Sequence, residues 1–186
     1  SNRCGTWSSD LTPITSSPTA EFGDGTYFVE SEVAPGLWRN SDSSEGCYWA
    51  RLSGFGGTLD DIEANEFSDV LQVVEIDPSD AGFHASDCGS WTYEPGAITE
   101  SPSADFGDGT YIVGLDIQAG TWETGSSPEG CYWARLSGFA GNLSDIIENE
   151  FIGEEEASAS SQTVTIGASD AGFVTDGCGD WTLTGS

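Results

Sequence analysis

Residues 46–55 read GCYWARLSGF, and residues 130–139 read the same ten letters. An identical stretch that includes Cys, Tyr, Trp and Arg does not arise from composition, so the chain contains an internal repeat. The offset between the copies, taken from Cys47 to Cys131, is 84 residues. From Cys47 to Leu52 the residues alternate with the two-residue period of a β-strand.

Other motifs recur in the same order on either side of this stretch. FGDGTY occupies 22–27 and 106–111, SDAGF occupies 79–83 and 169–173, and Cys-Gly-x-Trp occupies 88–91 and 178–181. The Gly-Asp-Gly and Asp-Ala-Gly sequences are turn signals beside short runs of strand-forming residues. We therefore expect an all-β fold of two tandem, homologous small β-sandwich or barrel-like units, each with about five strands and one short helix.

The repeat divides the chain into four segments. Unit 1 covers residues 21–94, unit 2 covers residues 105–186, and residues 95–104 link them. Residues 1–20 contain a copy of a closing strand, Cys4–Trp7, followed by a Ser/Thr/Pro linker. Since the rest of that earlier unit is absent from the sequence, we expect either a longer array or a segment that joins a neighbouring molecule.

Two stretches predict the short helix of each unit. Residues 58–62 and 142–146 each begin with a helix-capping residue and carry an aspartate three positions later. In unit 1 we expect Leu59, Ile62 and Phe67 to pack as the buried edge of this segment. We also expect the repeated aromatic residues, Phe55 among them, to supply much of the core.

The charge balance excludes several classes of partner. The chain has 32 acidic residues, four arginines and no lysine, which gives a formal net charge of −28. Such a surface repels nucleic-acid phosphates and anionic lipids, so we expect no nucleic-acid partner. No apolar run approaches the roughly 20 residues of a membrane span, so we expect no membrane insertion. Self-repulsion of this size favours a halophilic or marine source, where salt screens it.

The cysteines favour an oxidising, extracellular location, because small β-rich units with recurring cysteines are typical of secreted proteins. We expect disulfides Cys47–Cys88 and Cys131–Cys178, each joining the central strand to the last strand of its unit. Cys4 is then unpaired or bonded to a neighbouring molecule. An alternative disulfide pairing joins Cys4 to Cys47 and Cys88 to Cys131, and leaves Cys178 free.

Arginine and aspartate recur at matching positions. Arg51 and Arg135 are equivalent and make up half of the basic residues, while Asp80 and Asp170 are equivalent in the SDAGF turns. The planar guanidinium donates two parallel hydrogen bonds to a carboxylate, which suits a partly buried contact. We therefore expect structural ion pairs Arg51–Asp80 and Arg135–Asp170.

The acidic residues beside the Gly-Asp-Gly turns are candidate calcium ligands. They are Glu21, Asp24, Asp105 and Asp108, and hard cations favour several oxygens from one tight loop. We expect no other cofactor. The single histidine, His84, has no counterpart in unit 2, so we expect no Ser-His-Asp or metal-His mechanism and no enzymatic activity.

The motif order GxGTYxV, CYWARLSGF, SDAGF and CGxW resembles that of tandem repeat modules in secreted bacterial proteins. The resemblance covers nearly the whole chain and implies an exported, cell-surface or extracellular protein without implying an activity. We expect a structural role in a surface appendage, fibre or adhesin stalk, with head-to-tail self-association. The alternative is a carbohydrate- or calcium-dependent binding module, in which an exposed row of tryptophans would stack on a glycan.

Overall fold

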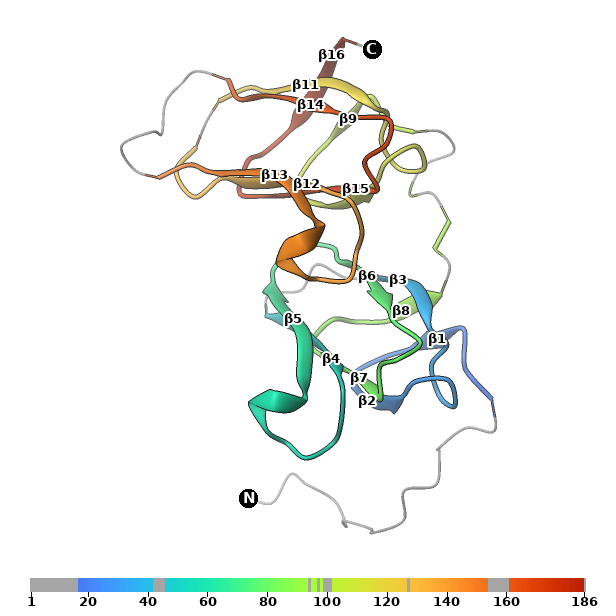
Figure 1. Ribbon diagram of the computed structural model, residues 1–186. Helices are drawn as coiled ribbons and strands as arrows, with labels where there is room; N and C mark the ends of the chain where they lie inside the picture. The colour runs from blue at the N-terminus through green and yellow to red at the C-terminus, as the bar shows by residue number, and fades with distance from the viewer. Residues whose placement is uncertain are drawn as a thin grey trace.

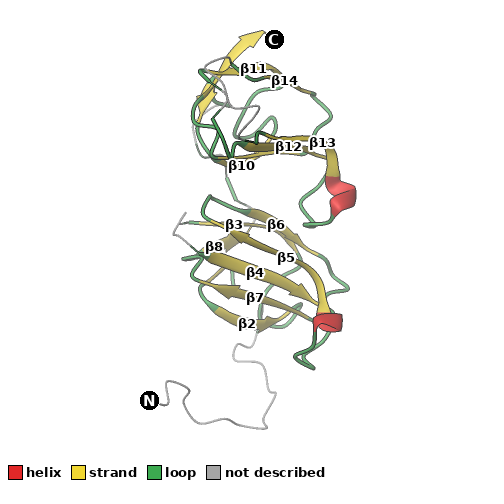
Figure 2. Ribbon diagram, turned by 90° about the vertical axis from the view of Figure 1, so that its left-hand side faces the viewer, coloured by secondary structure: helices red, strands yellow, loops and turns green. Residues whose placement is uncertain are grey.

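The computed structural model describes residues 17–41, 46–93, 95–96, 98, 102–126, 128–153 and 161–185. Within these residues the protein consists of sixteen β-strands and two short 3₁₀ helices. Each unit is a sandwich of two four-stranded sheets (Figures 1 and 2). The all-β class and the two tandem units are confirmed, although each unit has eight strands rather than about five.

Unit 1 contains two antiparallel sheets. The first has the order β1 (Glu21–Phe22), β8 (Trp91–Tyr93), β3 (Gly36–Asn40) and β6 (Val73–Ile76). The second has the order β2 (Gly25–Phe28), β7 (Gly82–Ser86), β4 (Cys47–Leu52) and β5 (Ile62–Ser68). The repeated stretch GCYWARLSGF therefore forms β4, which lies between two partners in its sheet.

Unit 2 repeats this topology strand for strand. Its first sheet has the order β9 (Asp105–Phe106), β16 (Trp181–Gly185), β11 (Gly120–Thr124) and β14 (Thr163–Ile166). Its second sheet has the order β10 (Gly109–Ile112), β15 (Gly172–Asp176), β12 (Tyr132–Leu136) and β13 (Ile146–Phe151). Because the strand registers also agree, positions in the two units can be compared one to one.

The two sheets of each unit close on a core of aromatic rings. In unit 1, Trp38, Phe83 and Trp91 have no exposed surface, and the rings of Phe83 and Trp91 meet edge to face at 5.4 Å. The counterparts in unit 2 are buried in the same way. Full burial of one such side chain stabilises a fold by about 1.5–3 kcal/mol.

The expected helix is a single 3₁₀ turn in each unit, η1 (Leu59–Asp61) and η2 (Leu143–Asp145). The capping signal itself is present, since the Asp61 carboxylate accepts the backbone N–H of Thr58 at 3.0 Å. The chain does not continue as a helix because Ile62–Ser68 pairs with β4 along its length. Strand pairing therefore overrides the local helix preference.

The prediction that Leu59, Ile62 and Phe67 form a buried edge is wrong for Leu59 and Phe67, whereas Ile62 is half-buried. Leu59 is 85% exposed on the single turn of η1, and Phe67 is 68% exposed on β5. In β5 the buried residues are Ala64 and Ser68, so Phe67 belongs to the opposite face of the strand, which points to solvent.

The units are stacked end to end, with the turn η2 of unit 2 directed toward unit 1 and the equivalent turn η1 directed away from unit 2 (Figure 1). The second sheet of unit 2 faces unit 1 across the boundary (Figures 1 and 2). No helix in the described part of the chain has the length and apolar character needed to span a membrane.

Candidate functional site: the joint between the two units

The units meet at a joint formed by a loop of unit 2 and a face of unit 1. The docking loop is Phe139–Gly141, between β12 and η2. The docking face comprises Arg39, Trp49, Arg51, Ala64, Val73 and Glu75, from β3, β4, β5 and β6. The carbonyl oxygen of Phe139 accepts the N–H of Glu75 at 2.8 Å, and that of Ala140 accepts a hydrogen bond from Arg51 Nη1 at 2.8 Å. The loop thus attaches through its backbone.

A buried ion pair reinforces the joint. Arg39 Nη2 contacts Asp116 Oδ2, and the side chains are 10% and 1% exposed. Asp116 also accepts the N–H groups of Ile98 at 3.0 Å and Ile112 at 2.8 Å, while Arg39 Nη1 donates to Gly96 O at 2.9 Å. The linker is therefore held by both members of the pair. Removing one partner of a buried pair typically costs about 3–5 kcal/mol, because the other charge stays buried.

The close approach of the loop requires glycine at position 141. Gly141 has a φ of +75°, and a Cβ there would lie 2.5 Å from Trp49 Cη2 and 3.4 Å from the Cβ of Ala64. The docked loop also buries its own aromatic residue: Phe139 is 7% exposed, whereas the equivalent Phe55 of unit 1 is 49% exposed. The prediction that Phe55 is a core residue is therefore wrong for unit 1, whose loop points away from unit 2.

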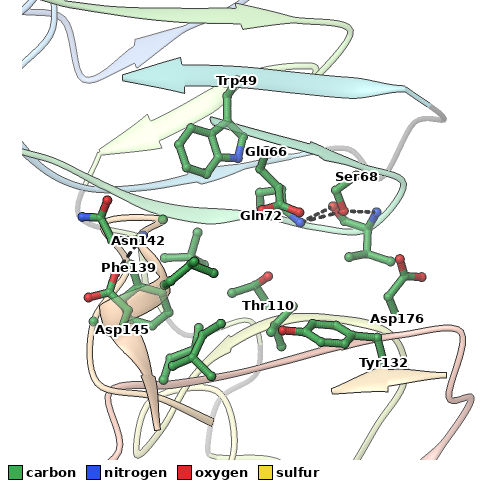
Figure 3. A pocket seen from close by; sticks show the side chains of 18 residues that line it. Trp49, Glu66, Ser68, Gln72, Thr110, Tyr132, Phe139, Asn142, Asp145 and Asp176 are labelled. Carbon is green, nitrogen blue, oxygen red and sulfur yellow. Dashed lines mark hydrogen bonds between the residues drawn. The ribbon is translucent and has the colours of Figure 1, made fainter. Parts of the chain in front are cut away.

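A cavity of about 300 Å³ lies within the joint (Figure 3). Trp49 and Glu66 line it from unit 1, and Tyr132 and Asp176 line it from unit 2. Partial loss of solvent in the joint, followed by the charge of Asp176, raises the pKa of Glu66, although its side chain keeps exposed surface. Burial, followed by the charges of two further aspartates, raises the pKa of Asp176. The joint therefore brings carboxylates of the two units together without a cation between them among the described residues.

The structure brings the expected arginines and aspartates together. Arg51 donates to Asp80 through Nε at 2.7 Å and Nη2 at 3.0 Å, and Arg135 donates to Asp170 at 2.7 and 3.1 Å. In both pairs the guanidinium group binds the carboxylate in a bidentate manner, through Nε and Nη2. Arg135 differs in one respect, because its Nη1 also donates to Glu148 Oε2 at 2.9 Å.

The four cysteines of the two units form the disulfides Cys47–Cys88 and Cys131–Cys178. Cys47 is the first residue of β4 and Cys131 directly precedes β12, while Cys88 and Cys178 lie just before the last strand of each unit. In the chain-entropy picture a loop of this size stabilises the fold by about 3–5 kcal/mol. Cys4, for which a joining role is expected, lies outside the described residues.

The candidate calcium ligands are spread between structural and exposed positions. The Asp24 carboxylate accepts the N–H of Cys88 at 3.3 Å, and that of Asp108 accepts the equivalent N–H in unit 2 at 3.0 Å. Glu21 and Asp105 are exposed on the short strands β1 and β9. Among the described residues, no group of three or more His, Cys, Asp and Glu side chains is placed to hold a metal ion.

Six of the seven tryptophans lie in the described residues, and all six are buried. Four have no exposed surface, while Trp49 and Trp133 are 2% and 4% exposed. An exposed row of tryptophan rings is therefore not formed by these six. The Nε1 atoms of Trp49 and Trp133 have no hydrogen-bond partner in the part of the chain that the structure describes.

Sequence reasoning missed Arg39 as a residue of the joint. Arg39 has no repeated counterpart, since the equivalent position in unit 2 is Glu123, and the repeated motifs therefore do not mark it. That asymmetry is itself the available signal. An arginine present in one unit and reversed in charge in the other marks a contact that only one unit makes.

Comparisons with known proteins agree with the repeat. No curated protein and no solved structure matches the chain significantly. Residues 19–92 and 103–182 each match one family, described as the Rv1352-like extracellular domain. The two matches coincide closely with the two sandwiches and cover most of the chain, so the protein consists of two tandem copies of an extracellular domain and belongs to the Rv1352-like extracellular domain family.

Proposed function

We propose that this chain is a structural module of an exported protein, and that it acts as a stiff two-unit segment in a surface appendage, fibre or adhesin stalk. The observation that supports this most is the joint. Its buried ion pair, its three backbone-anchored hydrogen bonds and its cavity-lining contacts hold two sandwiches end to end. A stalk needs this property, because it must hold the parts at its two ends a fixed distance apart.

The third hydrogen bond strengthens this argument. Thr110 N donates to Leu71 O at 2.9 Å, so the start of β10 is tied to unit 1 independently of the docking loop. Two attachment points on one rigid sandwich prevent rotation about either of them. Interfaces between domains of one chain are otherwise expected to allow relative motion unless they are large and apolar.

Small-angle X-ray scattering tests this role. The native chain should give a distance distribution of two units at fixed separation, unchanged between low and high salt. Arg39→Ala should broaden the distribution, because Asp116 loses its buried partner. A native chain whose dimensions change continuously with salt would be a hinged pair and would not serve as a stiff segment.

A glycan-binding role is the second candidate, and the cavity in the joint favours it. Aromatic Trp49 and Tyr132 line it together with Gln72 and Asn142. Such a mixture of rings and polar groups suits a sugar. A glycan array probed with the native chain tests this candidate. Binding that Asn142→Ala abolishes would support it, and the absence of any bound glycan would remove it.

A further inference from the structure

Unit 2 carries a counterpart of the docking face, formed by β11, β12, β13 and β14. A groove there is lined by Trp133, Arg135, Glu148, Asn149, Glu150, Thr163, Val164 and Thr165. The strand registers place Glu123, Trp133, Arg135, Glu148, Thr163 and Thr165 where unit 1 has Arg39, Trp49, Arg51, Ala64, Val73 and Glu75. The two faces share the tryptophan and the arginine of β4 and β12, but they differ at Arg39 against Glu123 and at Ala64 against Glu148.

The first difference concerns the arginine that binds the docking loop, because in unit 2 its Nη1 group already has another partner. In unit 1, Arg51 Nη1 donates to the carbonyl oxygen of Ala140, and Ala64 leaves room for the loop. In unit 2, Arg135 Nη1 donates to Glu148, which stands at the position of Ala64. A docking loop would therefore have to displace this carboxylate and lose its hydrogen bond.

The second difference is that unit 2 has an acidic residue, Glu123, at the position of the basic residue Arg39, which forms the ion pair of the joint. The residue of unit 1 equivalent to Asp116 is Glu32, and each of these carboxylates accepts the N–H of the residue four positions earlier. If one copy of the chain stacked on another as unit 2 stacks on unit 1, Glu123 would face Glu32. Two carboxylates would meet where the native joint has Arg39 and Asp116, and like charges at such a distance repel.

The loop of unit 1 that corresponds to the docking loop, Phe55–Gly57, has a similar sequence and the same backbone conformation at its last glycine. Residues 55–57 read FGG and residues 139–141 read FAG. Gly57 has a φ of +73°, close to the +75° of Gly141, and no atom of the described residues lies within 4 Å of a Cβ built on it. Phe55 is half exposed beside this open space. Unit 1 therefore presents a preformed loop at its outer end.

We propose that the Phe55–Gly57 loop docks another β-unit of this family, one that presents arginines where unit 1 has Arg39 and Arg51 and a small residue where it has Ala64. Glu123 and Glu148 block unit 2 as such a partner, so identical copies of this chain do not stack through this contact. Without the block, the head-to-tail contact would repeat without closing and build a filament.

The test converts the blocked face into an open one. The full-length double variant Glu123→Arg, Glu148→Ala restores the chemistry of Arg39 and Ala64 in unit 2. In sedimentation velocity its average mass should rise with concentration to at least about twofold that of the native chain, which stays monomeric. Adding Gly57→Asn should return the double variant to the monomer mass. Asparagine tolerates the left-handed conformation, but its Cβ would meet Trp133 as one on Gly141 would meet Trp49.

A double variant that is folded and stays monomeric would overturn the proposal, as would a native chain that assembles through a contact abolished by Gly57→Asn. If the double variant does not fold, the reciprocal variant decides: Ala64→Glu should draw Arg51 away from Ala140 and separate the units in scattering measurements. Unchanged dimensions for that variant would count against the blocking role of Glu148. The stalk role is judged separately, from the stiffness of the native chain, so the two can fail independently.

Discussion

Single residues distinguish two cores that otherwise match. Trp181 Nε1 donates to Thr175 Oγ1 at 3.0 Å, whereas Trp91 Nε1 has no hydrogen-bond partner among the described residues. The position of Thr175 is taken by Ala85 in unit 1. Ala85→Thr should therefore raise the free energy of unfolding by about 1 kcal/mol, the net value of one hydrogen bond. Urea denaturation measures it, and a destabilised variant would show that unit 1 has no room for the hydroxyl.

The two arginine–aspartate pairs should differ in strength. Asp80→Asn leaves Arg51 charged at 7% side-chain exposure and should destabilise the protein by about 3–5 kcal/mol. Asp170→Asn should destabilise it less, because Arg135 is more exposed and keeps Glu148. Equal losses in urea denaturation of the two variants would contradict this.

The Asp170 pair also predicts a pH dependence. Burial tends to raise the Asp170 pKa, but hydrogen bonds from Arg135 and Gly167 and the charge of Arg135 outweigh it and lower the pKa. A lowered pKa in the folded state stabilises the protein above the unfolded pKa of about 4, and this stabilisation is lost as the pH falls. The stability difference between native protein and Asp170→Asn should therefore narrow below about pH 4.

At the scale of elements, β5 and β15 each contribute a carboxylate to the joint, and the pH dependence of these two groups is opposite to that of Asp170. Glu66 and Asp176 have raised pKa values, so their ionisation opposes folding at neutral pH and protonation stabilises the folded state. Glu66→Gln should raise the melting temperature at pH 7.5, and the gain should shrink toward pH 5. Glu150→Gln, the equivalent change on β13, has the same effect on net charge and serves as the control in thermal melts. An equal gain for both variants would assign the effect to net charge alone.

The sequence predicted elements well where local and long-range signals agree. Gly-rich turns and alternating residues located most of the strands of each unit, and the repeated letters located both units. The helix prediction for residues 58–62 was wrong in extent because it rested on a capping signal that one turn satisfies. The conformation of residues 62–68 is decided by pairing with β4, a contact between residues that no local pattern reports.

The joint could not be predicted in the same way. The residues of the joint that differ between the units, such as Arg39 against Glu123 and Ala64 against Glu148, lie outside the repeated motifs, and the residues that the units share do not show which unit uses them. Phe55 and Phe139 follow identical stretches of sequence, but Phe139 is buried because its loop docks on unit 1, whereas the loop of Phe55 points away from unit 2. Burial at the boundary depends on the order of the units, which the letters of one unit do not contain.

For the whole molecule, a net charge of −28 predicts a dependence on ionic strength. Carboxylate repulsion destabilises the compact chain and is screened by salt, so the melting temperature should rise from near-zero to about 0.5 M sodium chloride. Calcium chloride at equal ionic strength separates screening from specific binding. A larger shift with calcium would support a calcium site, and the absence of any salt effect would contradict the repulsion argument.

Residual dipolar couplings of the native chain in a dilute aligning medium test the rigid joint most directly, because each unit reports its own alignment tensor. If the joint is stiff, one tensor of common magnitude and orientation should fit the described strands of both units. Gly141→Asn should split it into two, since its side chain would meet Trp49, while the matched variant Gly57→Asn on the free loop should leave it single. Two tensors of different magnitude in the native chain would show that the units move independently and would contradict the stiff two-unit segment.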